Sequence, residues 1–382
     1  MCRKAVTAKT QRTAETTRSL KIAFWHFHTF RLLRGIESLI VGLSNALVNR
    51  GVDVSIVTAA ATTPSLTAPD SRIKIYAYPT SRYYSHQFIV PFYVNHFLFH
   101  GYDHVVAFFA DFGEGSALRI INALRPMPLT LYLCYPYSGA PHRYHSFRRQ
   151  SWESKARNIF ADAIWIAEEA ERFFGRPVPV VPVGTDPDRF VPNSDMRRRS
   201  RHQWGFTEGD VVLLNVSSLE RRKGIHRVIQ TMSRLRRRFP RLRYFILGEG
   251  EEKPELVKLV SELGLNEVVI FAGTTSELEA AYNMADVFVM LTDAEGNSVA
   301  CHEAMSTGLP VVVSDTGGFI ESVPARAGFR VSPDDPKEID DALSRLIDDP
   351  LLRQTMGQAG RSHVQYDYSW DKTAEKFLKE LQ

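Results

Sequence analysis

Residues 291–314 read LTDAEGNSVACHEAMSTGLPVVVS, and this stretch contains the clearest structural pattern of the chain. An apolar run ends at Leu291, a turn with a glycine follows, and a β-branched run closes the segment. Between the two runs, Asn297 or Ser298 is suited to cap a helix that reaches about Thr307. This order of strand, turn, helix and strand predicts one unit of a parallel α/β sheet.

The same alternation of strand-like runs and helical periods extends along the chain from Leu20. In the first half the predicted strands are Lys21–Trp25, Val54–Val57, Ile73–Tyr76, His104–Phe109, Leu129–Leu133, Ala163–Ile166 and Val178–Val181. In the second half they are Val211–Val216, Tyr244–Leu247, Val268–Phe271, Val287–Leu291 and Pro310–Ser314. We therefore predict an α/β protein with two doubly wound, Rossmann-like domains and a cleft between them, where the strands' carboxyl ends bind ligands.

Length, composition and charge are typical of a globular enzyme of two domains, since the chain has 382 residues, 44% of them hydrophobic and 24% charged. The formal net charge of +4 resides in residues 1–19, which hold five basic residues against Glu15. We expect this segment to be a disordered basic tail, because it has no apolar block. The remainder is neutral overall, and the arginines of the helix after Gly224 lie opposite its apolar stripe, so no nucleic-acid partner is expected.

The sequence predicts a cytoplasmic protein that does not span a membrane. It contains no run of about 18 apolar residues, the length that a spanning helix needs. Cys2, Cys134 and Cys301 match no metal-ligand or redox spacing, which fits a reducing compartment. Basic and aromatic residues occur together at His142–Trp152, so a peripheral contact with an anionic membrane surface is a further expectation.

Two segments carry the chemistry. The start of the helix at Ser298 and Val299 offers free amides to an anion such as phosphate. Glu303 lies one turn further on the same face as Val299, where its carboxylate could accept hydrogen bonds from the vicinal hydroxyls of a ribose. Residues 216–224 read VSSLERRKG, which predicts Lys223 at the carboxyl end of a strand, facing a diphosphate as a point charge.

Taken together and in this order, the segments resemble the retaining glycosyltransferases of family 4, which have the GT-B fold. In that family Glu-x7-Glu marks the donor site, and Glu295 and Glu303 match it here. Further matches are Ala304-Met-x-x-Gly-x-Pro-Val-Val, Pro182-Val-Gly-Thr-Asp186, Leu247-Gly-Glu-Gly250, Phe271-Ala-Gly273 and Tyr368-Ser-Trp370. The resemblance covers Lys21 to Leu381 and is strongest between Pro182 and Glu321.

The resemblance implies a division of roles. Residues 20–190 would form an acceptor domain and residues 191–368 a donor domain, with a C-terminal helix at 369–382 that crosses back to the first. The implied donor site has Lys223 on the diphosphate, the amides of Ser298 and Val299 on phosphate, Glu303 on the ribose and Glu295 facing the transferred sugar. Gly35 in the loop Arg34–Glu37, Ser218 and Asn297 complete the expected donor-binding residues.

Two departures from the family pattern concern the catalytic groups. The family pairs the lysine with an arginine five residues earlier, and that position is Ser218 here. Because such a site must stabilise the charge of the leaving group, Arg221, Arg222 or Arg34 would have to supply the second cation. A histidine that the family often has at a strand end of the first domain is also absent, and the substitutes are His142, which we include among the catalytic residues, His145, His26 and His28.

We therefore expect a retaining glycosyltransferase that moves a sugar from a nucleotide-diphosphate sugar to a hydroxyl of a glycan or lipid-linked acceptor. No metal is expected, because the only Asp-x-Asp lies in the connector at Asp186 and not at a strand end. No cofactor is expected either, because no Gly-x-Gly-x-x-Gly follows the first strand. The alternatives are a nucleotide-sugar epimerase of the same fold, which would release no free nucleoside diphosphate, and a silent subunit that binds nucleotide without turnover.

Overall fold

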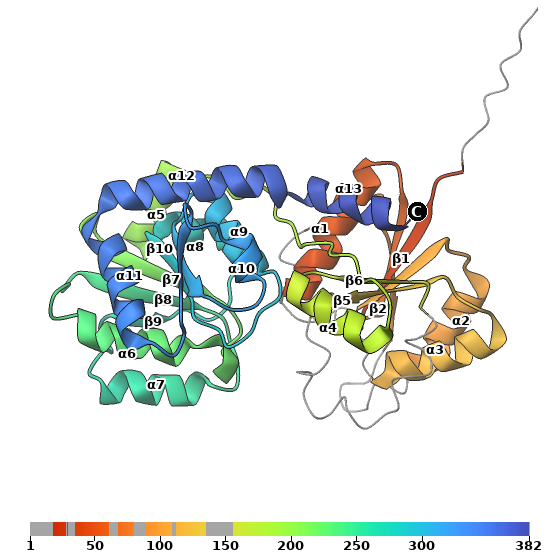
Figure 1. Cartoon of the computed structure of the whole chain (residues 1–382), viewed down its shortest axis with the longest axis horizontal. Helices are drawn as coiled ribbons and strands as arrows, with labels where there is room; N and C mark the ends of the chain where they lie inside the picture. Colours follow the sequence, from red (N-terminus) through yellow and green to blue (C-terminus); the bar gives the residue numbers. More distant parts are fainter. Residues whose placement is uncertain are drawn as a thin grey trace, which may run out of the picture.

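The computed structural model describes residues 18–27, 29, 35–60, 68–79, 89–108, 112–134 and 156–381, with the backbone alone at 112–116. Two six-stranded sheets, each with helices against it, lie side by side (Figure 1). All strand pairs in both sheets are parallel. The predicted class, an α/β protein with two doubly wound sheets, is confirmed.

The N-terminal sheet has the strand order β3-β2-β1-β4-β5-β6. Its elements are β1 Lys21–Trp25, α1 Gly35–Asn49, β2 Asp53–Ala59, β3 Lys74–Tyr78, α2 Val90–Phe99, β4 His104–Phe108, α3 Phe112–Leu124, β5 Leu129–Leu133, β6 Asn158–Ala161 and α4 Ile164–Phe174. The order reverses direction next to β1, so that the carboxyl ends of β1 and β4 flank a crevice where ligands bind in such folds.

The C-terminal sheet repeats this plan with the order β12-β11-β10-β7-β8-β9. Its elements are α5 Ser194–Gln203, β7 Val211–Val216, the short 3-10 helix η5 Arg221–Lys223, α6 Ile225–Leu235, β8 Leu242–Leu247, α7 Lys253–Glu262, β9 Val269–Phe271, α8 Leu278–Met284, β10 Val287–Met290, α9 Val299–Ser306, β11 Val311–Ser314, α10 Phe319–Ser322, β12 Gly328–Val331 and α11 Pro336–Asp348. Two helices follow, α12 Pro350–Asp367 and α13 Trp370–Leu381.

Two predicted strands need correction, and two strands, β6 and β12, were not predicted. Ala163–Ile166 is not a strand, because Ala163 precedes α4 and the apolar residues continue at a helical period to Ala170. The strand of this region is β6, which ends at Ala161. Val178–Val181 forms only a single bridge, between Ala161 and Val180. The strand β12, which contains Gly328, was not predicted.

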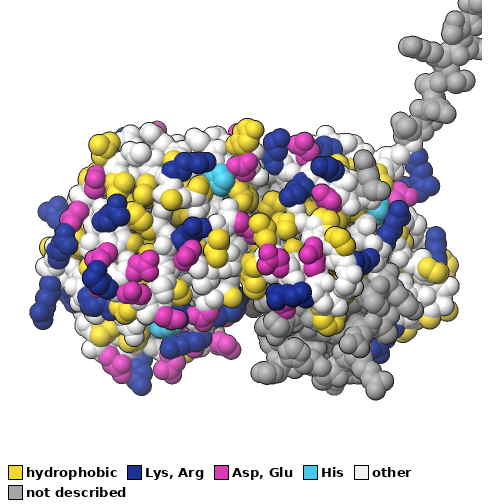
Figure 2. All heavy atoms as spheres, in the orientation of Figure 1, with side chains coloured by type: hydrophobic (Ala, Val, Ile, Leu, Met, Phe, Trp, Pro, Cys, Tyr) yellow, Lys and Arg dark blue, Asp and Glu magenta, His cyan; other side chains and the backbone are white. Residues whose placement is uncertain are grey.

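The arginine-rich helix α6 shows how charge is distributed on the C-terminal domain. Its apolar stripe is buried, as predicted, and its arginines face acidic side chains of neighbouring elements. Arg227 lies 3.0 Å from Asp334, and Arg234 lies 2.7 Å from Asp340. On the face shown in Figure 2, basic and acidic side chains are interspersed and form no patch of one sign.

The chain passes between the domains twice, and the two crossings are hydrogen-bonded to each other. The amide of Thr185 donates to the carbonyl of Tyr368 over 2.8 Å, and the amide of Trp370 donates to the carbonyl of Thr185 over 3.0 Å. From there α13 runs onto α1 of the N-terminal domain, as Figure 1 shows. Phe377 of α13 is fully buried against Phe24, with the ring centroids 6.0 Å apart.

Within the described residues, no helix has both the length and the apolar character that crossing a bilayer requires. The longest of these helices, α12, contains charged residues such as Arg353 and Arg361 and buries Met356 and Val364. A substantial part of it lies on the C-terminal domain in Figure 1.

The packing of α13 on α1 can be tested at Gly42. This glycine of α1 leaves room for the Trp370 ring. A Cβ at Gly42 would lie 2.2 Å from Cε2 of Trp370. We expect Gly42→Ala to destabilise the protein by about 1–3 kcal/mol, the usual cost of overpacking. The measurement is the thermal midpoint, with Gly101→Ala as control because a Cβ at Gly101 meets nothing within 4 Å. Equal midpoints for the two variants would show that the ring moves aside freely.

Candidate active site

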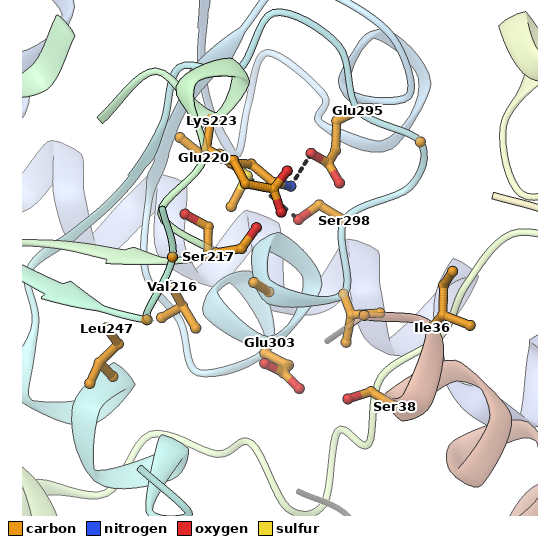
Figure 3. Close-up of a pocket in the computed structure, with 18 of the residues that line it drawn as sticks. Ile36, Ser38, Val216, Ser217, Glu220, Lys223, Leu247, Glu295, Ser298 and Glu303 are labelled. Atoms are coloured by element: carbon orange, nitrogen blue, oxygen red, sulfur yellow. Dashed lines mark hydrogen bonds and ion pairs between the residues drawn. The ribbon is translucent and has the colours of Figure 1, made fainter. Parts of the chain in front are cut away.

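A cavity of about 600 Å³ lies between the two sheets and is lined by residues of both domains. The N-terminal domain contributes the start of α1 and the residues that follow β5 and β6, including Cys134 and Asp162. The C-terminal domain contributes the strand ends of β7, β8 and β10 and the start of α9. In the close-up of Figure 3, Ile36 and Ser38 come from α1, while the other labelled residues come from the C-terminal domain.

The structure brings nearly all of the predicted site residues into this cavity. The residues that line it are Gly35, Ser218, Lys223, Glu295, Asn297, Ser298, Val299 and Glu303. The catalytic candidate His142 lies outside the described residues, as do His145, His28 and Arg34. His26 is 8% exposed, its Nδ1 lies 3.2 Å from the hydroxyl of Thr29, and it does not line the cavity.

Lys223 reaches the cavity from the end of the 3-10 helix η5. The following Gly224 has a φ of +66°, and a Cβ there would lie 1.7 Å from the carbonyl oxygen of Leu291, so only glycine fits this turn. Lys223 is 7% exposed, and its Nζ lies 2.5 Å from Oε2 of Glu295 (Figure 3). Two of the three residues with expected catalytic roles are therefore ion-paired, and a bound diphosphate would share the lysine.

Arg222 is the replacement cation that the geometry favours. Its Nη1 lies 3.6 Å from Oε2 of Glu295, and its side chain lines the cavity. Arg221 does not line the cavity, and its side chain is 68% exposed toward Glu252. Among the described residues, Arg222 is thus the alternative that accompanies Lys223 at the site.

Ser218, which stands in place of the family's arginine, also lines the cavity and interacts with Glu220. Burial raises the pKa of Glu220, but the charge of Arg222 and the hydrogen bonds from Ser218 and Arg222 outweigh it, so the pKa lies below its usual value. Glu220 therefore stays charged and holds Arg222 by a contact of 2.8 Å.

The start of α9 has the predicted cap. Ser298 is the N-cap residue, and its hydroxyl accepts a hydrogen bond from the amide of Cys301 over 3.3 Å. The amides of Val299 and Ala300 belong to the first turn, which has no partners inside the helix, and both residues line the cavity. This helix start is thus suited to an anion, as the sequence predicted.

Glu303 is buried at the opposite side of the cavity from Lys223, as Figure 3 shows. Its Oε2 accepts a hydrogen bond of 2.8 Å from the hydroxyl of Tyr282 in α8. Burial raises the pKa of Glu303 to about 7, although the Tyr282 hydrogen bond and the charge of Arg189 oppose the shift. Sequence reasoning missed Tyr282, because it stands in another helix and no motif links it to Glu303.

No metal centre is assembled by the part of the chain that the structure describes: no group of three or more His, Cys, Asp or Glu side chains there could hold an ion. The Asp-x-Asp at the connector has a local role instead. Asp186 accepts hydrogen bonds from the amides of Asp188 and Arg189, each over 3.0 Å, and so closes a turn.

Comparison with known proteins finds a family match within the second half of the chain. Residues 196–363 match the family of glycosyl transferases group 1. The C-terminal domain therefore resembles the domain of this family. This agrees with the resemblance to family 4, whose motifs lie largely in the same segment.

Two relatives illustrate the similarity in sequence. The chain is 36% identical over 211 residues to the GDP-mannose-dependent alpha-(1-6)-phosphatidylinositol monomannoside mannosyltransferase of Mycolicibacterium smegmatis, covering 53% of this chain and 55% of that protein. It is 33% identical over 211 residues to the D-inositol 3-phosphate glycosyltransferase of Corynebacterium jeikeium, covering 52% and 50%. The chain thus spans about half the length of the relatives that it matches.

Solved structures extend the likeness of the fold to nearly the whole chain. Sucrose-phosphate synthase from Thermosynechococcus elongatus superposes with a TM-score of 0.78 at 21% identity, covering 94% of this chain and 98% of that one. Anabaena HepE in complex with UDP and glucose gives a TM-score of 0.76 at 18% identity, covering 95% and 99%. The chain has the GT-B fold, with two Rossmann-like domains.

The raised pKa of Glu303 predicts a pH dependence of nucleotide-sugar binding. Below about pH 7 the carboxyl is protonated in the free protein and loses its ability to accept two hydrogen bonds from a ribose. Affinity for GDP-mannose or UDP-glucose should therefore fall with decreasing pH, by up to about tenfold for each unit below the pKa. A nucleotide sugar is the better probe than a free nucleoside diphosphate, whose terminal phosphate titrates near pH 6.

Two variants complete this test by calorimetry. Glu303→Gln should bind more weakly and lose the pH dependence, and Glu303→Ala should cost about 1–3 kcal/mol of binding free energy. If the folded Glu303→Gln variant keeps both the affinity and the pH slope, Glu303 does not contact the ribose.

Proposed function

We propose that this protein is a retaining glycosyltransferase that moves a hexosyl group from a nucleotide-diphosphate sugar to a hydroxyl of a glycan or lipid-linked acceptor. The observation that carries the proposal is the meeting of Lys223, Glu295, Glu303 and the start of α9 in one cavity between two doubly wound domains. Cations and amides on one side and a carboxylate on the other suit the diphosphate and the ribose of one ligand.

The reaction follows from these positions. The bond between the anomeric carbon and the diphosphate oxygen breaks, and a bond to the acceptor oxygen forms on the same face of the sugar. The acceptor proton passes to the leaving phosphate oxygen, so the proposal needs no protein nucleophile, metal ion or cofactor. Lys223, Arg222 and the amides of α9 stabilise the departing charge, and Glu295 stabilises the positive charge that develops on the sugar.

The relatives suggest which substrates to try first. One is named for GDP-mannose and a phosphatidylinositol monomannoside, and the other for D-inositol 3-phosphate. We therefore propose a hexose donor such as GDP-mannose, with an inositol-containing lipid or glycan as the acceptor. Such an acceptor would be reached by a protein of the cytoplasm in peripheral contact with an anionic membrane.

A screen of nucleotide sugars tests the proposed function. Binding and slow release of nucleoside diphosphate are measured with GDP-mannose and UDP-glucose, alone and with inositol phosphate or phosphatidylinositol vesicles. Transfer with retained anomeric configuration supports the proposal. Interconversion of sugars without release of nucleoside diphosphate would indicate an epimerase, and binding without turnover would indicate a silent subunit.

The cations at the leaving group give a further prediction. Lys223→Ala and Lys223→Met should lower turnover at saturating donor by about 100-fold or more, because each removes a charge that acts on the transition state. Arg222→Ala should lower turnover in the same direction. Arg221→Ala is the matched control, since its side chain is 68% exposed. Near-normal turnover of both Lys223 variants would transfer the role to Arg222 or to Arg34.

A further inference from the structure

Asp162, which follows β6, and the first residues of α4 contact the turn that contains Glu295. These contacts connect the N-terminal domain to that turn. The side-chain amide of Asn297 donates to the carbonyl oxygen of Asp162. The indole Nε1 of Trp165 donates to the carbonyl oxygen of Glu295 over 3.0 Å. A third contact lies beside them, where the amide of Ile164 donates to Glu321 over 2.9 Å. Two of the three contacts thus fall on residues 295–297.

The carboxyl group of Asp162 is packed against the same turn. Asp162 is 2% exposed, and a Cβ at Gly296 would lie 2.6 Å from its Oδ2. Only a glycine at position 296 therefore allows this approach. The other oxygen, Oδ1, is buried and has no hydrogen-bond partner among the described residues. Asp162 also lines the cavity, so a polar group of the N-terminal domain lies next to the expected place of the transferred sugar.

The surroundings of Asp162 favour its neutral form. Burial raises its pKa well above the usual range, and the charges of Glu295 and Glu321 raise it further, against opposing backbone hydrogen bonds. On the side of the N-terminal domain, Cys134 and Tyr132 are the titratable groups that interact with it. A protonated carboxyl both donates and accepts a hydrogen bond, and it adds no negative charge beside Glu295.

The turn also has contacts within its own domain, although residues 291–298 belong to no helix or strand. Lys223 and Arg222 contact the Glu295 carboxylate, and the carbonyl of Glu295 accepts a hydrogen bond of 3.0 Å from the amide of Gly318. The direction of the Glu295 side chain therefore depends both on these contacts and on the contacts that the N-terminal domain makes at residues 295–297.

We propose that Asp162 is a positioning residue of the donor site: from the N-terminal domain it holds the turn at residues 295–297, and so helps to place the Glu295 carboxylate. The inference rests on the proposed function, because it concerns the rate of sugar transfer. It also couples the domains, since the turn is held in this way only when α4 and the turn are in contact. Trp165 acts on the same turn through its indole.

The test compares Asp162→Ala, Asp162→Asn and Trp165→Phe with a control variant, Glu168→Gln. Glu168 is an exposed residue of α4, the helix that contains Trp165. We measure the affinity for GDP and UDP and the steady-state rates with GDP-mannose and UDP-glucose. Asp162→Ala keeps the main-chain carbonyl that Asn297 contacts but removes the carboxyl group that packs against Gly296. It should lower kcat by about tenfold or more, because small displacements of catalytic groups cost at least this much. Its nucleotide affinity should stay within about twofold, as ribose binding depends on Glu303. Trp165→Phe should lower kcat in the same direction, and Glu168→Gln should leave it unchanged.

The pH profile separates positioning from mere support of the fold. In the wild type, ionisation of Asp162 as the pH rises would bring a further negative charge beside Glu295 and Glu321, so kcat should decline with rising pH. Asp162→Asn should keep most of the activity and lose this decline, because its amide also donates and accepts hydrogen bonds but does not ionise. A decline that is identical in the wild type and in Asp162→Asn would contradict the inference.

The outcomes are distinguishable from those of the proposed function. A wild type that neither binds GDP or UDP nor turns over a nucleotide sugar overturns the proposed function itself. An active wild type with a folded Asp162→Ala variant of normal kcat overturns only the positioning role. If Asp162→Ala fails to fold, Trp165→Phe decides the matter, and a normal kcat for that variant is the contrary result.

Discussion

The pairing of the two interdomain crossings is the constraint on which the cleft depends. Thr185 on the first crossing is hydrogen-bonded to Tyr368 and Trp370 on the second crossing. The domains are therefore joined by two adjacent segments of the chain. One flexible connection would leave the sheets free to face in many directions. Two connections, with α13 buried against α1, direct the carboxyl ends of both sheets toward a shared cavity.

Within this cavity, the carboxylates of Glu220 and Glu295 interact with the cations Lys223 and Arg222. Lys223 and Arg222 both approach Glu295, and Glu220 also holds Arg222. A diphosphate that bound here as proposed would have to compete with these carboxylates, and the ion pair would orient the lysine before the ligand arrived. At the far side of the cavity, Glu303 accepts a hydrogen bond from the neutral hydroxyl of Tyr282, and the charge of Arg189 also acts on its carboxyl group. Lys223 thus lies on the opposite side of the cavity from Glu303 (Figure 3).

The periodicity of the sequence was sufficient to predict the structural features that depend on residues close together in the chain. Short-range patterns predict the helix after Gly224, the cap at Ser298 and the positions of most strands along the chain, and the structure confirms these features. The apolar run from Ala163 was misread as a strand, because a short apolar run fits a buried strand or a buried helix equally well. That error hid Asp162, which becomes a strand-end residue only when β6 is placed at Asn158–Ala161. Tyr282 was missed for a different reason, since its contact with Glu303 is tertiary.

Both domains line the cavity, and this arrangement affects how such a site can favour transfer of the sugar over its hydrolysis. Most groups that would hold the nucleotide come from the C-terminal domain, whereas Asp162 and Trp165 reach the turn at Glu295 from the other domain. If Glu295 acts as proposed, its carboxylate is fully positioned only when the domains are in contact. In that state the cleft is also most closed to water. Coupling these two events would let the nucleotide bind to one domain first, without activating the sugar in an open and hydrated cleft. The polar contacts between the domains can then be understood as part of the chemistry, because they define the state in which it proceeds.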